Sequence, residues 1–227
     1  MSDGSNGVNM NKIMSCCKDE NMTRGEGGCG ECACANDTMK MPLIGKELPD
    51  MEFEAYQNEK IKDIKLSDYH GKWLILFFYP KDFTFVCPTE LEEMAEHYEE
   101  FKKLNTEVLS VSRDTVYVHK AWHDVSEAVG KVQYPMISDP TGKLCTALGV
   151  NIDDEGVSLR ATFVVNPEGK IVSMEVNSND IGRSAGELVC KLQAAQFVAE
   201  HGGNVCPASW KPGDEPLKPG LDLVGKI

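Results

Sequence analysis

One stretch decides the fold and the chemistry of this chain, residues 77–90, which read FFYPKDFTFVCPTE. It continues the apolar run Trp73–Tyr79, which is typical of a strand buried on both faces. A short loop follows up to Cys87, and Pro88 favours the first turn of a helix because its missing N–H would be unpaired there. The pattern places Cys87 at or beside the N-cap of a helix, just past the carboxyl end of a strand, where α/β sheets carry reactive groups.

A thiol at that position has unusual chemistry. Free cysteines are mostly protonated at pH 7, whereas helix N-terminal N–H groups and a neighbouring guanidinium favour the thiolate. The helix terminus supplies only about 0.3–1 kcal/mol, and the glutamates at positions 90, 92 and 93 weaken its positive end. We therefore expect a cation beside Cys87, and Thr84 can place a hydroxyl on the sulfur. The alternative, a thiol that packs as a small apolar side chain, fits poorly with Pro80, Thr84 and Pro88 around it.

The cation must come from one of four arginines, Arg24, Arg113, Arg160 and Arg183. Arg113 ends one expected strand, and Arg160 begins another that we expect to run antiparallel to the central pair. Both could reach the Cys87 loop. The pattern alone leaves the choice open, and topology mildly favours Arg113.

Length and composition restrict the function classes. The chain has 227 residues, 41% of them hydrophobic, which allows a real core in one domain with extensions or in two small domains. Its net charge of −13 argues against nucleic acid and anionic membranes as partners. No apolar run approaches about 18 residues and no signal peptide is apparent, so we expect a cytoplasmic protein without membrane insertion. Nine cysteines then favour thiols, metal or redox disulfides over a structural disulfide scaffold.

The chain is expected to have three parts. Residues 1–40 contain no Leu, Phe, Tyr or Trp and are predicted to be a disordered arm, because they cannot bury enough apolar surface to offset ordering entropy. Residues 41–201 are predicted to form the globular domain. Residues 202–227 are predicted to form an irregular tail, which holds four of the eleven prolines.

The globular part mixes strand and helix patterns. The expected elements are a hairpin of 51–57 and 60–66, strands at 73–79, 107–112 and 134–138, a second hairpin of 161–165 and 170–176, helices at 88–104, 116–129 and 184–201, and a helical turn at 143–148. Parallel units combined with hairpins predict a three-layer α/β sandwich, with a mixed central sheet flanked by helices and an extended C-terminal tail.

The Cys87 loop has no local second thiol, because Thr84 stands where a Cys-x-x-Cys motif would have its first cysteine. This favours an enzyme whose partner thiol comes from elsewhere. Cys206, in the proline-rich tail, is the candidate. Cys145 and Cys190 fall on expected helices, where packing in the core is the favoured interpretation.

Two patterns raise the question of a metal. His119 and His123 have the spacing of zinc proteases without the intervening glutamate, so a solvated helix face is the favoured interpretation. The arm could bind zinc or copper(I) through its thiols, but it lacks a second well-spaced cysteine pair, and a mobile set of exchanging thiols is the alternative. We assign no metal and no cofactor. The cysteines of the arm are Cys16, Cys17, Cys29, Cys32 and Cys34.

Residues 77–90 closely resemble the signature of typical two-Cys peroxiredoxins of the AhpC/TSA family, and the similarity covers roughly residues 42–227. It includes LRATF at 159–163, Gly182-Arg183 and VCPASW at 205–210. HKAWH at 119–123 and LDLVGKI at 221–227 resemble the alkyl hydroperoxide reductase C subfamily of bacteria. By composition, the Cys-rich arm resembles that of amoebic peroxiredoxins of the Entamoeba type.

The resemblance implies a thioredoxin-like fold and a thiol-specific peroxidase active in antioxidant defence and redox homeostasis. It selects Arg160 over Arg113. Cys87 would be the peroxidatic cysteine and Cys206 the resolving cysteine of the other subunit. The remaining implied site residues are Thr84, Pro80 and Arg160, with Glu90 and Arg183 as a supporting network.

The resemblance also implies a cycle and partners. Peroxide converts Cys87 to a sulfenic acid, which condenses with Cys206 across a homodimer, and hydrogen peroxide or organic hydroperoxides become water or alcohols. A dithiol reductant, thioredoxin or a flavoprotein disulfide reductase, then restores both thiols. Such dimers commonly form decameric rings.

Two features of peroxide-sensitive eukaryotic members are missing. Val129–Val132 stands where they have a Gly-Gly-Leu-Gly insertion, and their Tyr-Phe tail helix is absent from the sequence. We hypothesise that the Cys87 loop unwinds readily, so that disulfide formation outruns over-oxidation. The competing class is a binding or surface protein, with the arm used for metal or adhesion and the ring as a holdase. The preferred peroxide, the reductant and non-classical surface exposure stay open.

Overall fold

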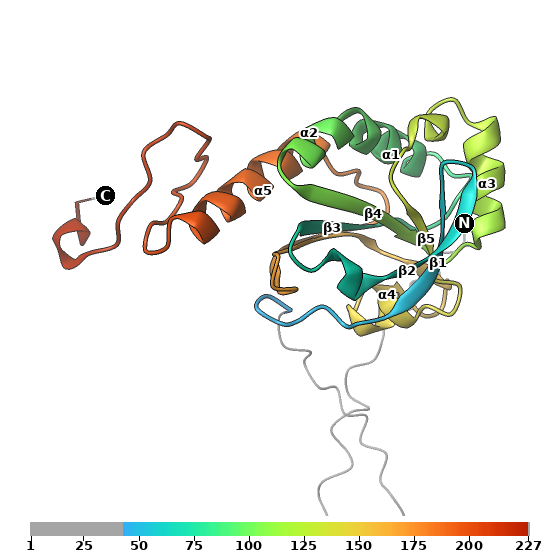
Figure 1. The fold of residues 1–227 in the computed structure, drawn as a ribbon, viewed down its shortest axis with the longest axis horizontal. Coiled ribbons are helices and arrows are strands. Elements are labelled where there is room, and N and C mark those ends of the chain that lie inside the picture. The colour runs from blue at the N-terminus through green and yellow to red at the C-terminus, as the bar shows by residue number, and fades with distance from the viewer. Residues whose placement is uncertain (1–42, 227) are drawn as a thin grey trace, which may run out of the picture. The chain divides into compact units, whose positions relative to one another are not determined.

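The computed structural model describes residues 43–226, which fold around a mixed sheet flanked by helices (Figure 1). The expected arm lies outside the described residues. The strands are β1 (Glu52–Gln57), β2 (Lys60–Lys65), β3 (Trp73–Phe78), β4 (Thr106–Ser112), β5 (Met136–Ser138), β6 (Asn151–Ile152), β7 (Val157–Ser158), β8 (Arg160–Val165) and β9 (Ile171–Asn177). The helices are α1 (Cys87–Glu96), α2 (Tyr98–Lys103), α3 (Val116–Val125), α4 (Lys143–Ala147) and α5 (Ala185–Glu200). Seven strands form the main sheet in the order β2-β1-β5-β4-β3-β8-β9, and β6 pairs with β7.

Strand β3 is the centre of the architecture, and all six of its residues are buried. It pairs in parallel with β4 and antiparallel with β8. Because successive strand residues point to opposite faces, Ile75 and Phe77 enter one core while Leu74, Leu76 and Phe78 enter the other. The first core is completed by α1, α2, α3 and α5, and the second by α4. The predicted three layers are confirmed.

The expected turns and caps are also in place. Strands β1 and β2 pair from Glu52 opposite Lys65 to Gln57 opposite Lys60. The turn residues between them have positive φ angles of 49° and 60°, as a tight two-residue hairpin requires. Helix α5 begins after Ser184, whose hydroxyl accepts a hydrogen bond from Glu187 N at 3.4 Å.

The helices differ from the sequence prediction at two places. The helix expected over 88–104 is divided into α1 and α2 at His97, whose backbone turns at φ −88° and ψ −1°. The helix expected over 116–129 ends at Val125, because the backbone of Ser126 is extended. The Ser126 hydroxyl accepts a hydrogen bond from Val129 N at 3.3 Å, and a short 3₁₀ turn begins at Val129. The β6–β7 hairpin was not predicted, since its two-residue strands are too short to show a periodicity.

The two helical cysteines have different environments. Cys145 is fully buried, as expected, and burial raises the pKa of its thiol, which keeps it protonated and inert. Cys190 is exposed, so its predicted place in the core is wrong. The buried stripe of α5 runs through Ala185, Leu188, Val189 and Leu192, and position 190 lies off that stripe.

The tail after α5 (red in Figure 1) is ordered by a few contacts with itself and with the end of α5. Val205 and Leu217 exchange backbone hydrogen bonds of 2.8 and 2.9 Å. The Trp210 indole packs on the Phe197 ring with centroids 4.8 Å apart and donates to Asp214 O at 3.0 Å. Within residues 43–226, no helix has the length and apolar character needed to cross a membrane.

Candidate active site

The carboxyl end of β3 delivers Cys87 to the start of α1, as the sequence predicts. Val86 is the N-cap and Pro88 occupies the first turn. The Thr89 hydroxyl donates to Val86 O at 2.7 Å, which holds that turn together. Cys87 is 0% exposed and lies in the same core as the apolar side of α1. Its sulfur is thus held at a helix N-terminus, out of contact with solvent.

Arg160 is the cation beside this sulfur. It begins β8, which pairs antiparallel with β3, and the neighbouring pair Ala161 opposite Phe78 fixes its position. Its Nη1 lies 3.3 Å from Cys87 Sγ and 2.6 Å from Glu90 Oε2, and its Nε donates to Asn179 O at 2.9 Å. Among residues 43–226, Nη2 has no hydrogen-bond partner. Arg160 can therefore bind the sulfur and still offer a donor to a second ligand.

Arg113, which topology mildly favoured for this place, lies elsewhere. Its Nη1 donates to Asn151 Oδ1 at 3.3 Å and its Nη2 to Pro140 O at 3.4 Å. Arg113 thus links strand β6 to the loop that contains Pro140.

Glu90, one turn after Cys87 on α1, binds two arginines at once. Its Oε2 accepts from Arg160, and its two oxygens accept from Arg183 Nε at 2.9 Å and Nη2 at 3.1 Å. The backbone N of Arg183 also donates to Oε1 at 2.9 Å. The remaining Nη1 of Arg183 donates to Ala161 O at 2.8 Å and to Thr162 Oγ1 at 3.1 Å. Its guanidinium carbon lies 3.6 Å from the centre of the Phe77 ring, which covers its flat face.

The charges of this cluster are unequal without the sulfur. Arg160, Arg183 and Glu90 are 3%, 7% and 3% exposed, so water screens none of them. Two guanidinium groups and one carboxylate leave one positive charge in excess. Excess charge in a protein interior is costly unless it is paired. The excess positive charge of the cluster faces the Cys87 sulfur, which lies 3.3 Å from Arg160 Nη1.

The other predicted pocket residues lie in the loop before Cys87. Pro80 is buried where β3 ends, and Thr84 is half-buried. The Thr84 hydroxyl donates to Lys81 O at 3.0 Å, so in this structure its proton goes to the loop backbone and its expected contact with the sulfur stays a prediction. Cys206 is not brought to Cys87 within one chain. Its Sγ faces Ala194 O at 3.8 Å, and partial burial raises the pKa of its thiol.

A second buried polar cluster holds the same loop, and the sequence did not predict it. The Asp82 carboxylate accepts from the Tyr79 hydroxyl at 2.8 Å and lies 2.7 Å from His119 Nδ1. His119 Nε2 lies 3.2 Å from Ile137 O. His119 is 0% exposed, so its expected place on a solvated helix face is wrong. His123 is half-buried and its Nε2 lies 3.1 Å from Val132 O. The available signal was an acid in the loop and a histidine on α3, which only the fold brings together.

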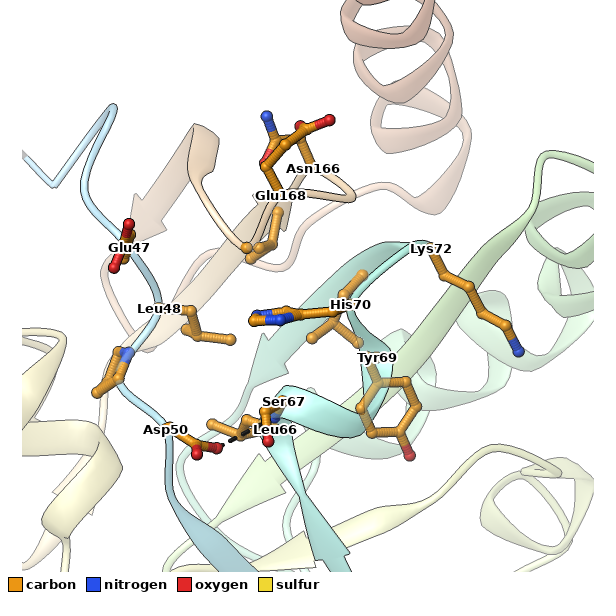
Figure 2. Close-up of a pocket in the computed structure, with 14 residues that line it drawn as sticks. Glu47, Leu48, Asp50, Leu66, Ser67, Tyr69, His70, Lys72, Asn166 and Glu168 are labelled. Carbon is orange, nitrogen blue, oxygen red and sulfur yellow. Dashed lines mark hydrogen bonds between the residues drawn. The ribbon is translucent and has the colours of Figure 1, made fainter.

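A well-formed cavity lies away from these groups, at the opposite end of β3 (Figure 2). Its volume is about 430 Å³, and Figure 2 shows His70 beside Leu48 within it. Asp50 accepts from Ser67 N at 3.2 Å, and partial burial raises the pKa of Tyr69 to about 12. With no thiol among its lining residues, this cavity does not supply the chemistry of the Cys87 site. No group of three or more metal-ligating side chains is found within residues 43–226, and the metal interpretation of the arm lies outside them.

The buried network predicts a large difference between two neighbouring glutamates. Replacing Glu90 by Gln (Glu90→Gln) leaves two buried guanidiniums without a counter-charge and is expected to cost about 3–5 kcal/mol of unfolding free energy. Glu92→Gln is the matched control on the same helix, since Glu92 pairs with Lys131 at the surface and should cost less than about 1 kcal/mol. Urea denaturation measures both, and equal losses would contradict the assigned network.

Comparison with known proteins places this site in a family. The family model described as AhpC/TSA family matches residues 44–174, and the one described as C-terminal domain of 1-Cys peroxiredoxin matches residues 194–223. These matches leave the arm outside, so its likeness to amoebic peroxiredoxins stays a prediction. Over 187 residues the chain is 50% identical to alkyl hydroperoxide reductase C of Pseudomonas aeruginosa and 48% identical to that of Bacillus subtilis. Both alignments cover 82% of this chain and 100% of the relative.

Solved structures agree with the sequence comparison. Alkyl hydroperoxide reductase C (AhpC) of Enterococcus faecalis is 53% identical with a TM-score of 0.72, over 74% of this chain and 100% of that one. The reduced 2-Cys peroxiredoxin of Plasmodium vivax is 34% identical with a TM-score of 0.77, over 80% and 95% of the two chains. The chain therefore belongs to the AhpC/TSA family and has the thioredoxin-like fold of peroxiredoxins.

Proposed function

We propose that this protein is a thiol peroxidase that reduces hydrogen peroxide and organic hydroperoxides to water and alcohols. One observation carries the proposal: the Cys87 sulfur, buried at the start of α1, lies 3.3 Å from the Arg160 guanidinium in a cluster with one positive charge in excess. A nucleophilic thiolate needs such a setting. The names of the relatives, hydroperoxide reductase and peroxiredoxin, support the same substrate class.

In the first step the Cys87 thiolate attacks the nearer oxygen of the peroxide. The S–O bond forms while the O–O bond breaks, so the sulfur loses two electrons and the distal oxygen leaves as hydroxide or alkoxide. That anion takes up a proton to become water or alcohol. In this proposal the developing charge is stabilised by Arg160 Nη2, which has no partner among the described residues. Cys87 is left as a sulfenic acid. In this proposal Pro80 and Thr84 shape the pocket.

In the second step Cys206 of the partner subunit attacks the Cys87 sulfenic acid, an S–S bond forms and water leaves. Cys87 is fully buried, so the first turn of α1 must open before the two sulfurs can meet. Thiol–disulfide exchange with a dithiol protein then regenerates both thiols. Thioredoxin and a flavoprotein disulfide reductase are the two proposed classes of reductant.

The two edges of the sheet support the proposed homodimer. Strand β2, at one edge, carries Lys60, Lys62 and Lys65, a common means of blocking further strand pairing. Strand β9, at the other edge, exposes Met174 and Val176 at 38% and 40%. An apolar open edge favours pairing with a second copy. We propose that β9 forms the dimer interface.

A second exposed apolar surface supports association of dimers into a decameric ring. Phe83 and Phe85, in the Cys87 loop, are 55% and 92% exposed. Large aromatic side chains with this exposure are typical of protein interfaces. A catalytic cycle that needs reduced thiols also suits the cytoplasm, and exposure at the cell surface is the alternative left open by the sequence.

Substitution of the two cysteines tests the chemistry. Cys87→Ser is expected to reduce peroxide consumption to background, because the attacking atom is removed. Cys206→Ser is expected to consume one equivalent of peroxide per chain and then stop in the absence of small thiols, because no disulfide can form. Peroxide loss and intact-protein mass measure both results. Continued turnover of Cys87→Ser would sink the proposal.

Removal of residues 1–40 tests the competing role of the arm. The shortened chain keeps Cys87, Arg160 and Cys206, so it is expected to retain most of the peroxidase activity of the full chain. Loss of activity on removal of the arm would show that the arm belongs to the catalytic machinery.

The dimer edge is tested by a pair of matched lysine substitutions. Val176→Lys places charge into the proposed β9 interface and is expected to weaken self-association at least about tenfold, or about 1.4 kcal/mol. Ile61→Lys places the same charge on the β2 edge and is the control. Sedimentation velocity measures association, and non-reducing gels after peroxide treatment measure the Cys87–Cys206 crosslink. Equal behaviour of the two variants would contradict the assigned edge.

A further inference from the structure

A second carboxylate of α1 reaches the start of α5. Glu93 Oε1 accepts a hydrogen bond from the Ser184 hydroxyl at 3.2 Å and from Ala185 N at 3.1 Å. Ala185 N belongs to the first turn of α5, whose N–H groups have no partner within the helix. The negative charge also suits the positive end of the α5 dipole. This contact therefore ties one helix to the beginning of another across the chain.

Glu90 and Glu93 act on the same short segment. They are three residues apart, which places them on one face of α1, and they bind the consecutive residues Arg183, Ser184 and Ala185. The segment lies close to the start of α1, because a Cβ built on Gly182 would lie 3.4 Å from Val86 Cγ1. The first two turns of α1 are thus docked on this segment at two points.

The two points differ in what they do for the sulfur. Glu90 balances charge beside Cys87 and cannot be removed without unbalancing the buried arginines. Within residues 43–226, Glu93 makes no hydrogen bond or ion pair with Cys87, Arg160 or the Arg183 side chain, and it is half-buried, so water can replace it at Ala185 N. Its loss leaves the charge balance of the site intact. It releases only the second anchor of α1, next to the turn that must open for Cys206 to reach Cys87.

We propose that Glu93 is a positioning residue, whose bridge to Ser184 and Ala185 holds the first turn of α1 closed over Cys87. The inference rests on the proposed peroxidase function and deepens it. A closed turn keeps the Cys87 sulfenic acid away from Cys206 and leaves it time to react with a second peroxide, which transfers an oxygen to sulfur, leaves as water or alcohol and gives sulfinate. Glu93 thereby sets how the sulfenic acid divides between disulfide and sulfinate.

Hydrogen exchange tests the positioning role without requiring any peroxidase activity. In reduced full-length protein, Glu93→Ala is expected to speed amide hydrogen exchange in residues 89–92 about fivefold. A change of this size corresponds to the free energy of about one hydrogen bond. Exchange in β3 and β4 stays unchanged. Glu187→Ala is the matched control, because Glu187 is an exposed acid in the first turn of α5 and does not bridge to α1. Glu93→Gln, which keeps an acceptor oxygen, is expected to retain most of the protection.

The partition of the sulfenic acid is the second readout. After turnover with millimolar peroxide, mass spectrometry is expected to find a severalfold lower ratio of Cys87 sulfinate to Cys87–Cys206 disulfide in Glu93→Ala than in the unmodified protein or Glu187→Ala. Unchanged exchange at 89–92, or equal acceleration throughout the domain, would overturn the positioning role. If the unmodified protein consumed no peroxide, the proposed function would fail while hydrogen exchange still decided whether Glu93 holds the turn.

Discussion

The Glu90 carboxylate, held between two guanidinium groups, is the interaction on which the rest of the site depends. Its two oxygens accept from Arg160 and Arg183, and all three side chains are buried. Removing either sign of charge leaves the other unpaired in a region that water does not reach, which costs several kcal/mol. The carboxylate also joins the helix that carries Cys87 to the backbone of Arg183, just before α5. One side chain therefore fixes both the electrostatics of the thiol and the position of its helix.

The fold supplies this interaction by placing β8 beside β3. Arg160 begins β8 at the end of the sheet where β3 ends. Its guanidinium therefore lies beside the Cys87 sulfur, although the two residues are 73 positions apart in the chain. The same arrangement creates a conflict. The buried network beside Cys87 also shields its sulfur, so the proposed cycle needs a site that is closed for the attack on peroxide and open for the reaction with Cys206. In the proposed cycle, the hydrogen bonds that Glu90 and Glu93 make with the start of α5 set that balance.

Local features of this site could be predicted from sequence, and features that depend on register could not. The apolar run of β3 and the proline after Cys87 determine the strand and the helix start within a short window. The choice between Arg113 and Arg160 was different, because both lie at strand ends and only the pairing of β8 with β3 decides which one reaches the sulfur. The sequence pattern predicted His119 on the exposed face of α3. In the structure it is buried, and its ring is paired with the carboxylate of Asp82, 37 residues earlier in the chain. Family resemblance identified Arg160 where pattern alone did not.

The role of Arg160 beside Cys87 is tested most directly by the rate at which Cys87 reacts with peroxide when Arg160 is replaced by Lys. Lysine keeps the charge but cannot bind Cys87, Glu90 and Asn179 O together as the guanidinium does. Stopped-flow fluorescence can follow sulfenic acid formation through Trp122, which lies in the same core as Cys87. The second-order rate constant is expected to fall about 100-fold, because the donor beside the reacting oxygens is lost. A rate constant within about threefold of the unmodified protein, well short of the effect of one lost donor, would contradict this role of Arg160.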